Sequence, residues 1–333
     1  MHVKTDTQLA SVEIGTLWTT YMNDSMAVCA LKYFLEKVKD TDIRPAIEYA
    51  LGVSQKHVQD IAGFFSKEGY PIPHGFTDED VDVSVPPLFH DTFYLLYLRY
   101  LGTFGLNAYG VALPIMARRD IVDFFTQSLN ESIELTRKIT ATMQSLGVFM
   151  RSPIIEIPDK IDFVKKENFF AGFLGRRKLT TIEIAHIYAN IKNNISGKAL
   201  VTGFAQVAES DKVKNLMVRG KSIASKNIDV LSNLLKEDDI PASMIWDSFV
   251  TTSTETPFSD KLMLFHTTVM NAAGIGNYGT ALSTSMRHDI QVDYARLTSD
   301  IAQYASDCVS VMIENGWLEQ PPQAIDHEAL AKV

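Results

Sequence analysis

The stretch GLNAYGVALPIMARRDI, at residues 105 to 121, returns as GIGNYGTALSTSMRHDI at residues 274 to 290. Eight of the seventeen aligned positions are identical at a constant offset of 169 residues. The identical pairs include Tyr109 with Tyr278 and Arg118 with Arg287. Similarity at a fixed spacing is the signature of an internal repeat, and it constrains the architecture before any local pattern does. The chain is therefore predicted to consist of two related copies.

Each copy has the apolar spacing of four helices. In the first copy these cover residues 8 to 39, the stretch from Pro45 to Gly69, the stretch that begins near Pro87, and a last helix that ends at Gly147. The second copy follows the same plan, because LTTIEIAHIY at residues 179 to 188 aligns with LASVEIGTLW at residues 9 to 18. Three details are predicted for these helices: a kink at Pro114, a start of the second copy's third helix at Pro257, and an end of its last helix at Gly316.

A long segment, YPIPHGFTDEDVDVSVPP at residues 70 to 87, separates the second and third helices of the first copy. An extended chain of this length reaches roughly 60 Å, whereas a thirty-residue helix is about 45 Å long. The segment can thus cross a bundle from end to end. Two short hairpins joined by a long crossover are typical of ferritin-like four-helix bundles. We predict an all-α protein of two tandem ferritin-like four-helix bundles, at residues 1–150 and 179–333, with a connecting segment at 151–178.

The connecting segment is rich in aromatic residues, including Phe163, Phe169, Phe170 and Phe173. We predict that the last three are largely buried and clasp the bundles in one orientation. Each Phe→Ala change would then cost about 3–5 kcal/mol if the ring is fully buried. A membrane-surface helix is the alternative, and the acidic balance of the chain disfavours it.

Charge and composition exclude several function classes. The chain has a net charge of −9 and a pI of about 5.4, and an acidic chain without a basic block does not suit nucleic-acid binding. The N-terminal residues lack the apolar core of a signal peptide, and no apolar run is long enough for a membrane helix. Cys29 and Cys308 each lie in an apolar helical pattern. We therefore predict a cytoplasmic protein with buried, reduced thiols.

Ligands for a di-metal centre are the first chemistry to test in such a fold. Ferritin-like enzymes use a Glu from each of two helices and a Glu-x-x-His from each of the other two. Glu183 and His186 have this spacing, but their counterparts in the first copy are Glu13 and Thr16. Glu183 also completes a Thr-x-x-Glu capping box that begins at Thr180. Glu183 and His186 are thus the candidate metal ligands, and we predict no bound metal and no cofactor.

A small-ligand pocket beside each repeated tyrosine is another possibility. Tyr109 and Tyr278 are each followed by a glycine, so a neighbouring helix can approach closely while the hydroxyl finds a partner. His90 and His266 lie on the third helices and are candidate ligand-binding residues, although isolated histidines are more often structural.

The arginines of the repeated stretch have a structural interpretation. Arg118 and Arg287 suit the C-terminal end of a helix through its dipole, and Asp120 suits the N-cap of the next helix.

The two copies together resemble a family of duplicated, uncharacterised bundle proteins from spore-forming Firmicutes that is related to the spore coat protein F group. The resemblance rests on the Tyr-Gly-x-Ala-Leu…Arg-x-Asp-Ile motif and on the Val/Ile-Glu-Ile motif around Glu13 and Glu183. It implies a non-enzymatic structural or interaction protein, with the spore coat as a location and another protein or a second copy as the partner. The alternative is a ferritin-like metal-binding or oxidase protein with a degenerate or rearranged site.

Overall fold

The computed structural model describes residues 7–173, 175–242 and 249–324, and over these residues the protein is helical without a named strand. The all-α prediction is confirmed. The eight long helices are α1 (Ser11–Lys37), α2 (Arg44–Lys67), α3 (Asp91–Ala112), α4 (Arg119–Ser145), α5 (Thr181–Val207), α6 (Asp211–Lys236), α7 (Asp260–Thr284) and α8 (His288–Glu314). Short 3-10 turns are η1 (Asp78–Asp80), η2 (Leu113–Ile115) and η3 (Glu167–Phe170).

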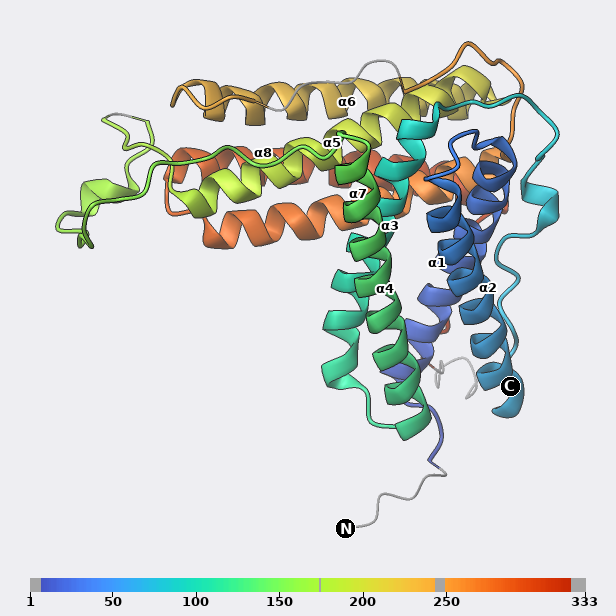
Figure 1. The fold of residues 1–333 in the computed structure, drawn as a ribbon. Coiled ribbons are helices and arrows are strands. Elements are labelled where there is room, and N and C mark those ends of the chain that lie inside the picture. Colours follow the sequence, from blue (N-terminus) through green and yellow to red (C-terminus); the bar gives the residue numbers. More distant parts are fainter. Residues whose placement is uncertain (1–6, 174, 243–248, 325–333) are drawn as a thin grey trace.

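The helices form two groups of four, which we call the first half (α1 to α4) and the second half (α5 to α8). Figure 1 shows the first half upright and the second half lying across its upper end. The most extensive contacts are those of α1 with α2, α3 with α4, α5 with α6 and α7 with α8, as expected for two hairpins in each half. In the described part of the chain, no helix is both long enough and apolar enough to cross a membrane.

The glycine stops at the helix ends follow the predicted signals, whereas Pro114 and the starts of the third helices do not. Gly69, Gly147 and Gly316 follow helix ends with φ values of 70°, 68° and 67°, the left-handed conformation that glycine adopts without strain. Pro114 does not kink a continuing helix, since α3 ends at Ala112 and the proline lies in η2. The third helices begin at Asp91 and Asp260, later than predicted.

Asp91 and Asp260 each cap a neighbouring turn. Asp91 Oδ2 accepts the backbone N–H groups of Lys39 and Asp40 at 2.9 and 2.7 Å. The equivalent Asp260 accepts those of Glu209 and Ser210 at 3.2 and 2.8 Å. Each aspartate therefore pins the start of a third helix to the turn between the first two helices of the same half.

The two halves meet through their crossovers. Val81 pairs with Phe258, and Phe89 pairs with Val250, in isolated antiparallel bridges. At the constant offset Val81 corresponds to Val250 and Phe89 to Phe258, so each contact recurs with the two copies exchanged. This exchange is what a two-fold axis produces at a symmetric interface. The halves are therefore related by a local pseudo-two-fold axis, like the subunits of a dimer fused into one chain.

The hydrogen bonds beside these bridges obey the same exchange. Asp82 N donates to Pro257 O at 2.9 Å, and the equivalent bond runs from Thr251 N to Leu88 O, also at 2.9 Å. On the axis itself, Tyr97 and its equivalent His266 meet each other, with 3.0 Å between the hydroxyl and Nε2. The crossovers thus form the interface between the halves as well as linking helices.

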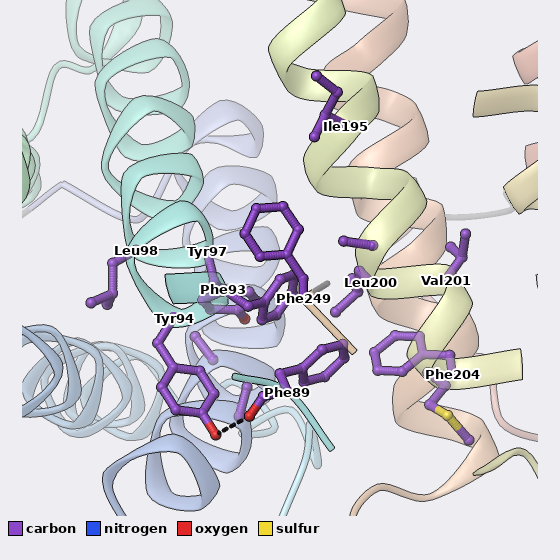
Figure 2. Packing of buried hydrophobic residues seen from close by; sticks show 14 of the residues in the cluster. Phe89, Phe93, Tyr94, Tyr97, Leu98, Ile195, Leu200, Val201, Phe204 and Phe249 are labelled. Atoms are coloured by element: carbon purple, nitrogen blue, oxygen red, sulfur yellow. Dashed lines mark hydrogen bonds between the residues drawn. The ribbon is translucent and has the colours of Figure 1, made fainter. Parts of the chain in front are cut away.

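Buried aromatic residues fill this junction, and one apolar core continues through it from half to half. Figure 2 shows Phe89, Phe93 and Tyr97 facing Leu200 and Phe204 across it. A Cβ atom at Gly203 would lie 2.6 Å from the Phe89 ring, so α5 accommodates this ring only because it has glycine there. A second, smaller cluster occupies the end of the first half that is remote from the junction.

The connecting segment does not clasp the halves. Phe173 is 71% exposed and Phe170 is 42% exposed, while Phe169 is partly buried beneath the Arg177 guanidinium at 4.1 Å from the ring centroid. The prediction of three largely buried phenylalanines is wrong, and the condition of full burial on which the predicted stability effect depends is not met. The crossovers already bury the junction, so the segment finds little apolar surface to cover. We call residues 151–178 the connecting arm, of which residue 174 lies outside the described residues.

Candidate functional site

The repeated glutamates lie at the remote end of each half. Glu13 accepts backbone N–H groups of Ala10, Ala117 and Arg118 at 2.7, 3.1 and 2.8 Å. Glu183 accepts the equivalent ones, from Thr180, Met286 and Arg287, at 2.9, 3.1 and 3.2 Å. One buried carboxylate per half thus joins the start of the first helix to the start of the fourth.

Arg118 and Arg287 complete these clusters. Arg118 binds Asp120 at 2.7 and 2.9 Å and Glu68 at 2.6 Å. Arg287 binds Asp289 at 3.1 and 2.6 Å and approaches Asp238 at 3.8 Å. Each arginine is the N-cap residue of a fourth helix, and Asp120 lies in the first turn. The predicted role of the arginines at a helix C-terminus is therefore wrong, and so is the predicted N-cap role of Asp120. The backbone is already extended at each arginine, which lets its guanidinium make two hydrogen bonds to the aspartate two residues later.

Glu183 has the capping role that the sequence predicts. It closes the capping box with Thr180 and also receives two hydrogen bonds from Arg177 at 2.7 and 2.9 Å. Burial opposes the charged form, but hydrogen bonds from Arg177 and Thr180 outweigh it and lower the pKa of Glu183 to about 2. His186 lies elsewhere, on the wall of a cleft described below. Among the described residues, no three His, Cys, Asp or Glu side chains form a group suited to a metal ion.

Tyr109 lies beside a charged network inside the first half. Nδ1 of the buried His57 is 3.0 Å from Asp24 Oδ2, and its Nε2 is 2.8 Å from Glu131 Oε2. Ser54 donates a hydrogen bond to Asp24 at 2.8 Å, and the rings of Tyr109 and His57 meet edge to face at 6.1 Å. The cavity that these residues line has a volume of only about 40 Å³.

Tyr278 lies beside a neutral network in the second half. Its hydroxyl accepts hydrogen bonds from Nδ2 of Asn194 at 2.7 Å and Nδ2 of Asn227 at 3.2 Å. These asparagines occupy the positions of Asp24 and His57, so the same location is charged in one half and uncharged in the other. The adjacent cavity is about 80 Å³, well below the ~300–1,000 Å³ typical of sites for drug-sized ligands.

The sequence prediction included Tyr109 and Tyr278 but missed Asp24, His57 and Glu131. The first helices align at an offset of 170 residues, with Leu9 opposite Leu179. Continuing that offset along the first two helices would have paired Asp24 with Asn194 and His57 with Asn227. Polar residues at equivalent places in both copies are the signal that these positions share an interior location.

His57 carries a proton at neutral pH. Burial disfavours the charged ring, but the charges of Asp24 and Glu131 and their hydrogen bonds outweigh burial and raise the pKa of His57 to about 9. Both ring nitrogens then donate, so neither offers a lone pair to a metal.

The double substitution Asp24→Asn with His57→Asn copies the second half's network into the first. A raised folded-state pKa gives stability that is complete below the unfolded-state pKa near 6.5 and is lost as pH rises through 9. The wild-type free energy of unfolding should therefore fall by about 3 kcal/mol across this window, and the double variant should lose this dependence. Urea titrations at several pH values measure it, with the exposed His90→Asn as control. An unchanged slope in the double variant would contradict the assignment.

His90 and His266 do not join either tyrosine. His90 is exposed, and its backbone N–H donates to Phe249 O at 2.9 Å. His266 is buried at the junction against Tyr97, and burial lowers its pKa to about 4.

Cys29 and Cys308 are buried free thiols, as predicted, and burial raises their pKa values to about 12 and about 11. Neither thiol suits nucleophilic chemistry.

A large cavity lined by described residues lies between the halves, where α3 faces α5 and α7. It has a volume of about 1020 Å³ and mostly apolar walls, which include Leu96, Phe104, Val111 and Met150. Arg99 and Lys192 also line it. Sequence reasoning missed this inter-half cleft, because its walls come from helices of different copies.

Two equivalent helical halves with internally satisfied polar clusters define an all-α protein with a duplicated plan. The model of a family described as "protein of unknown function (DUF3231)" matches residues 1–161 and again residues 168–330. The chain belongs to this family. No curated protein matches the chain. A crystal structure of a proposed spore coat protein from Bacillus halodurans C-125 is similar with a TM-score of 0.39 and 17% identity, over 45% of this chain and 98% of that one.

Proposed function

We propose that this chain is a non-enzymatic interaction protein that associates with a second copy of itself through the connecting arm. The observation that carries the proposal is the exposure of several apolar side chains within this short segment. Ile154, Ile157 and Ile161 are 84%, 91% and 88% exposed. Single exposed apolar residues are ordinary on protein surfaces, whereas a contiguous group marks an interaction site.

The buried polar groups support a structural role over catalysis. Glu13 and Glu183 are occupied by backbone N–H groups, and His57 is held by two carboxylates. Groups that serve in catalysis need a free lone pair or proton directed at a substrate. In the described part of the chain these clusters instead fasten helices to one another.

The charge pattern of the arm favours a second copy as the partner. Between residues 156 and 162 the acidic Glu156, Asp159 and Asp162 outnumber the basic Lys160, and Lys165 and Lys166 follow. Two arms that run antiparallel would place the acidic part of each beside the basic part of the other. Such self-complementarity is what a two-fold contact requires.

Replacing Ile154, Ile157 and Ile161 together by serine is expected to abolish self-association without unfolding the protein. Light scattering across a dilution series should show wild-type dimers and monomers of the variant, with equal melting temperatures. The matched control replaces three exposed apolar residues of the second half, Val218, Val292 and Ile313, by serine. A wild-type protein that is monomeric at every concentration, or a control that dissociates equally, would refute the proposal.

The finer architectural predictions belong to the same proposal. We propose that each half is a ferritin-like four-helix bundle. The domain division would then be a first bundle at residues 1–150, the connecting arm at 151–178 and a second bundle at 179–333. Association with the spore coat is a prediction from the sequence resemblance, and finding the protein only in the cytoplasmic fraction of sporulating cells would contradict it.

The alternative is a ferritin-like metal-binding or oxidase protein with a rearranged site. Asp24, His57 and Glu131 would be its closest approach to a ligand set, since they converge from α1, α2 and α4. Metal binding there would have to displace a proton and two hydrogen bonds from His57. Stoichiometric metal in the purified protein, lost on His57→Asn, would favour this alternative.

A further inference from the structure

The inter-half cleft combines an apolar body with two unneutralised cations. Arg99 and Lys192 both approach the ring of Phe149, at 5.2 and 5.7 Å from its centroid. None of the described residues that line the cleft is an aspartate or a glutamate. Neither Arg99 nor Lys192 forms an ion pair with a described acidic side chain. In a chain with a net charge of −9, this concentration of positive charge is unexpected.

Two polar atoms of residues that line the cleft also lack hydrogen-bond partners within the described chain. Arg99 Nη1 and the Tyr100 hydroxyl are buried without a hydrogen bond. Buried donors normally find an acceptor, and leaving one unpaired is costly. The hydrogen bond from Lys192 Nζ to Met150 O is long, at 3.4 Å. These donors are therefore available to an acceptor from outside the chain.

The proximity of the two charges affects Lys192 directly. Burial, together with the positive charge of Arg99, lowers the pKa of Lys192 to about 8. A bound anion would relieve both effects, because it would neutralise the pair and accept the unused hydrogen bonds.

The remaining walls define the rest of the ligand. The cavity of about 1020 Å³ is at the upper end of the range for small-molecule sites, and most of its surface is apolar. We propose that the inter-half cleft binds a long-chain carboxylate of the fatty-acid class, with its carboxylate on Arg99 and Lys192 and its chain along α3 and α7. This site is separate from the connecting arm and does not depend on self-association.

Binding of palmitate to the delipidated full-length protein, followed by titration calorimetry, tests the proposal. We expect one palmitate to bind per chain. Hexadecanol lacks the charge, and its affinity should be lower by about tenfold or more. The double variant Arg99→Gln with Lys192→Gln should reduce palmitate affinity by about tenfold or more.

A second pair of variants tests the apolar wall without removing any interaction. Gly276 lines the cleft on α7, and a Cβ there meets no atom within 4 Å, so Gly276→Leu should fill the cavity and weaken binding while the helix persists. Gly279, three residues further on the same helix, is equally open but lies outside the cleft, and Gly279→Leu is the matched control.

Each possible result decides the proposal. Loss of binding in the charge variant and in Gly276→Leu, with retention in Gly279→Leu and in the triple serine variant of the arm, would support it. Absence of palmitate binding to wild type, equal binding of hexadecanol, or binding lost only with the arm isoleucines would overturn it. A failure of self-association leaves these outcomes unaffected, so the two proposals are separable.

Discussion

Replacing Phe89 by alanine should lower the free energy of unfolding by about 3–5 kcal/mol. The ring is buried, stacks on Phe93 with 4.1 Å between centroids, and meets Phe34 edge to face at 6.4 Å. It also lies against Gly203 of the opposite half, so its removal leaves a cavity lined by both copies. Because one core continues through the junction, we expect both halves to unfold in a single calorimetric transition that shifts to lower temperature.

Gly203 provides a sharper test of the same contact. The single variant Gly203→Ala introduces a Cβ at 2.6 Å from the Phe89 ring, and such overpacking costs about 1–3 kcal/mol. In the Phe89→Ala background the new methyl group would enter the vacated space, so the two losses should not add. The exposed Phe173→Ala is the control and should change stability by less than about 0.5 kcal/mol. Additive losses, or two transitions of which only one moves, would show that the halves do not share a core.

The helices could be predicted because their information is local. Apolar spacing can be recognised within a single helix, and Gly69 and Gly147 mark the ends of single helices. The repeat of Tyr109 at Tyr278 is visible by aligning the sequence with itself. The interface between the halves could not be predicted in this way. It depends on pairing Val81 with Phe258, in segments that have neither helical nor strand period, and on a glycine at position 203 whose importance comes from a ring more than a hundred residues away.

The connecting arm shows the limit of reasoning from composition. Phe170 and Phe173 are apolar enough to be buried, but burial also needs an uncovered apolar surface, and the crossovers already occupy the junction. The inter-half cleft was missed for a related reason. Arg99 and Lys192 look like solvent-facing residues in their own helices, and only the meeting of α3 with α5 places them together without a carboxylate.

The second large effect is expected at Arg287, whose side chain is only 1% exposed. Arg287→Met keeps the volume but removes the charge that faces Asp289 at 2.6 Å and Asp238 at 3.8 Å. Removing one partner from a buried charge cluster typically costs about 3–5 kcal/mol, because the remaining charges stay desolvated. Arg287→Lys should be intermediate, since lysine keeps the charge but cannot form the forked contact.

The equivalent variant in the first half, Arg118→Met, is the comparison. It removes the same ion pair in a more exposed setting, so the difference between the two variants measures the effect of burial on stability. Arg118 has the same fork to Asp120, but the Asp120 side chain is 38% exposed and Glu68 is 18% exposed, so water can replace the lost partner. We expect a loss of about 1–3 kcal/mol there, less than at Arg287, in urea unfolding at neutral pH. Equal losses in the two halves would mean that the motif acts through local helix geometry. A larger loss at Arg287 would mean that desolvated charge makes the second cluster the more costly one to break, although the two share every residue of the Arg-x-Asp-Ile motif.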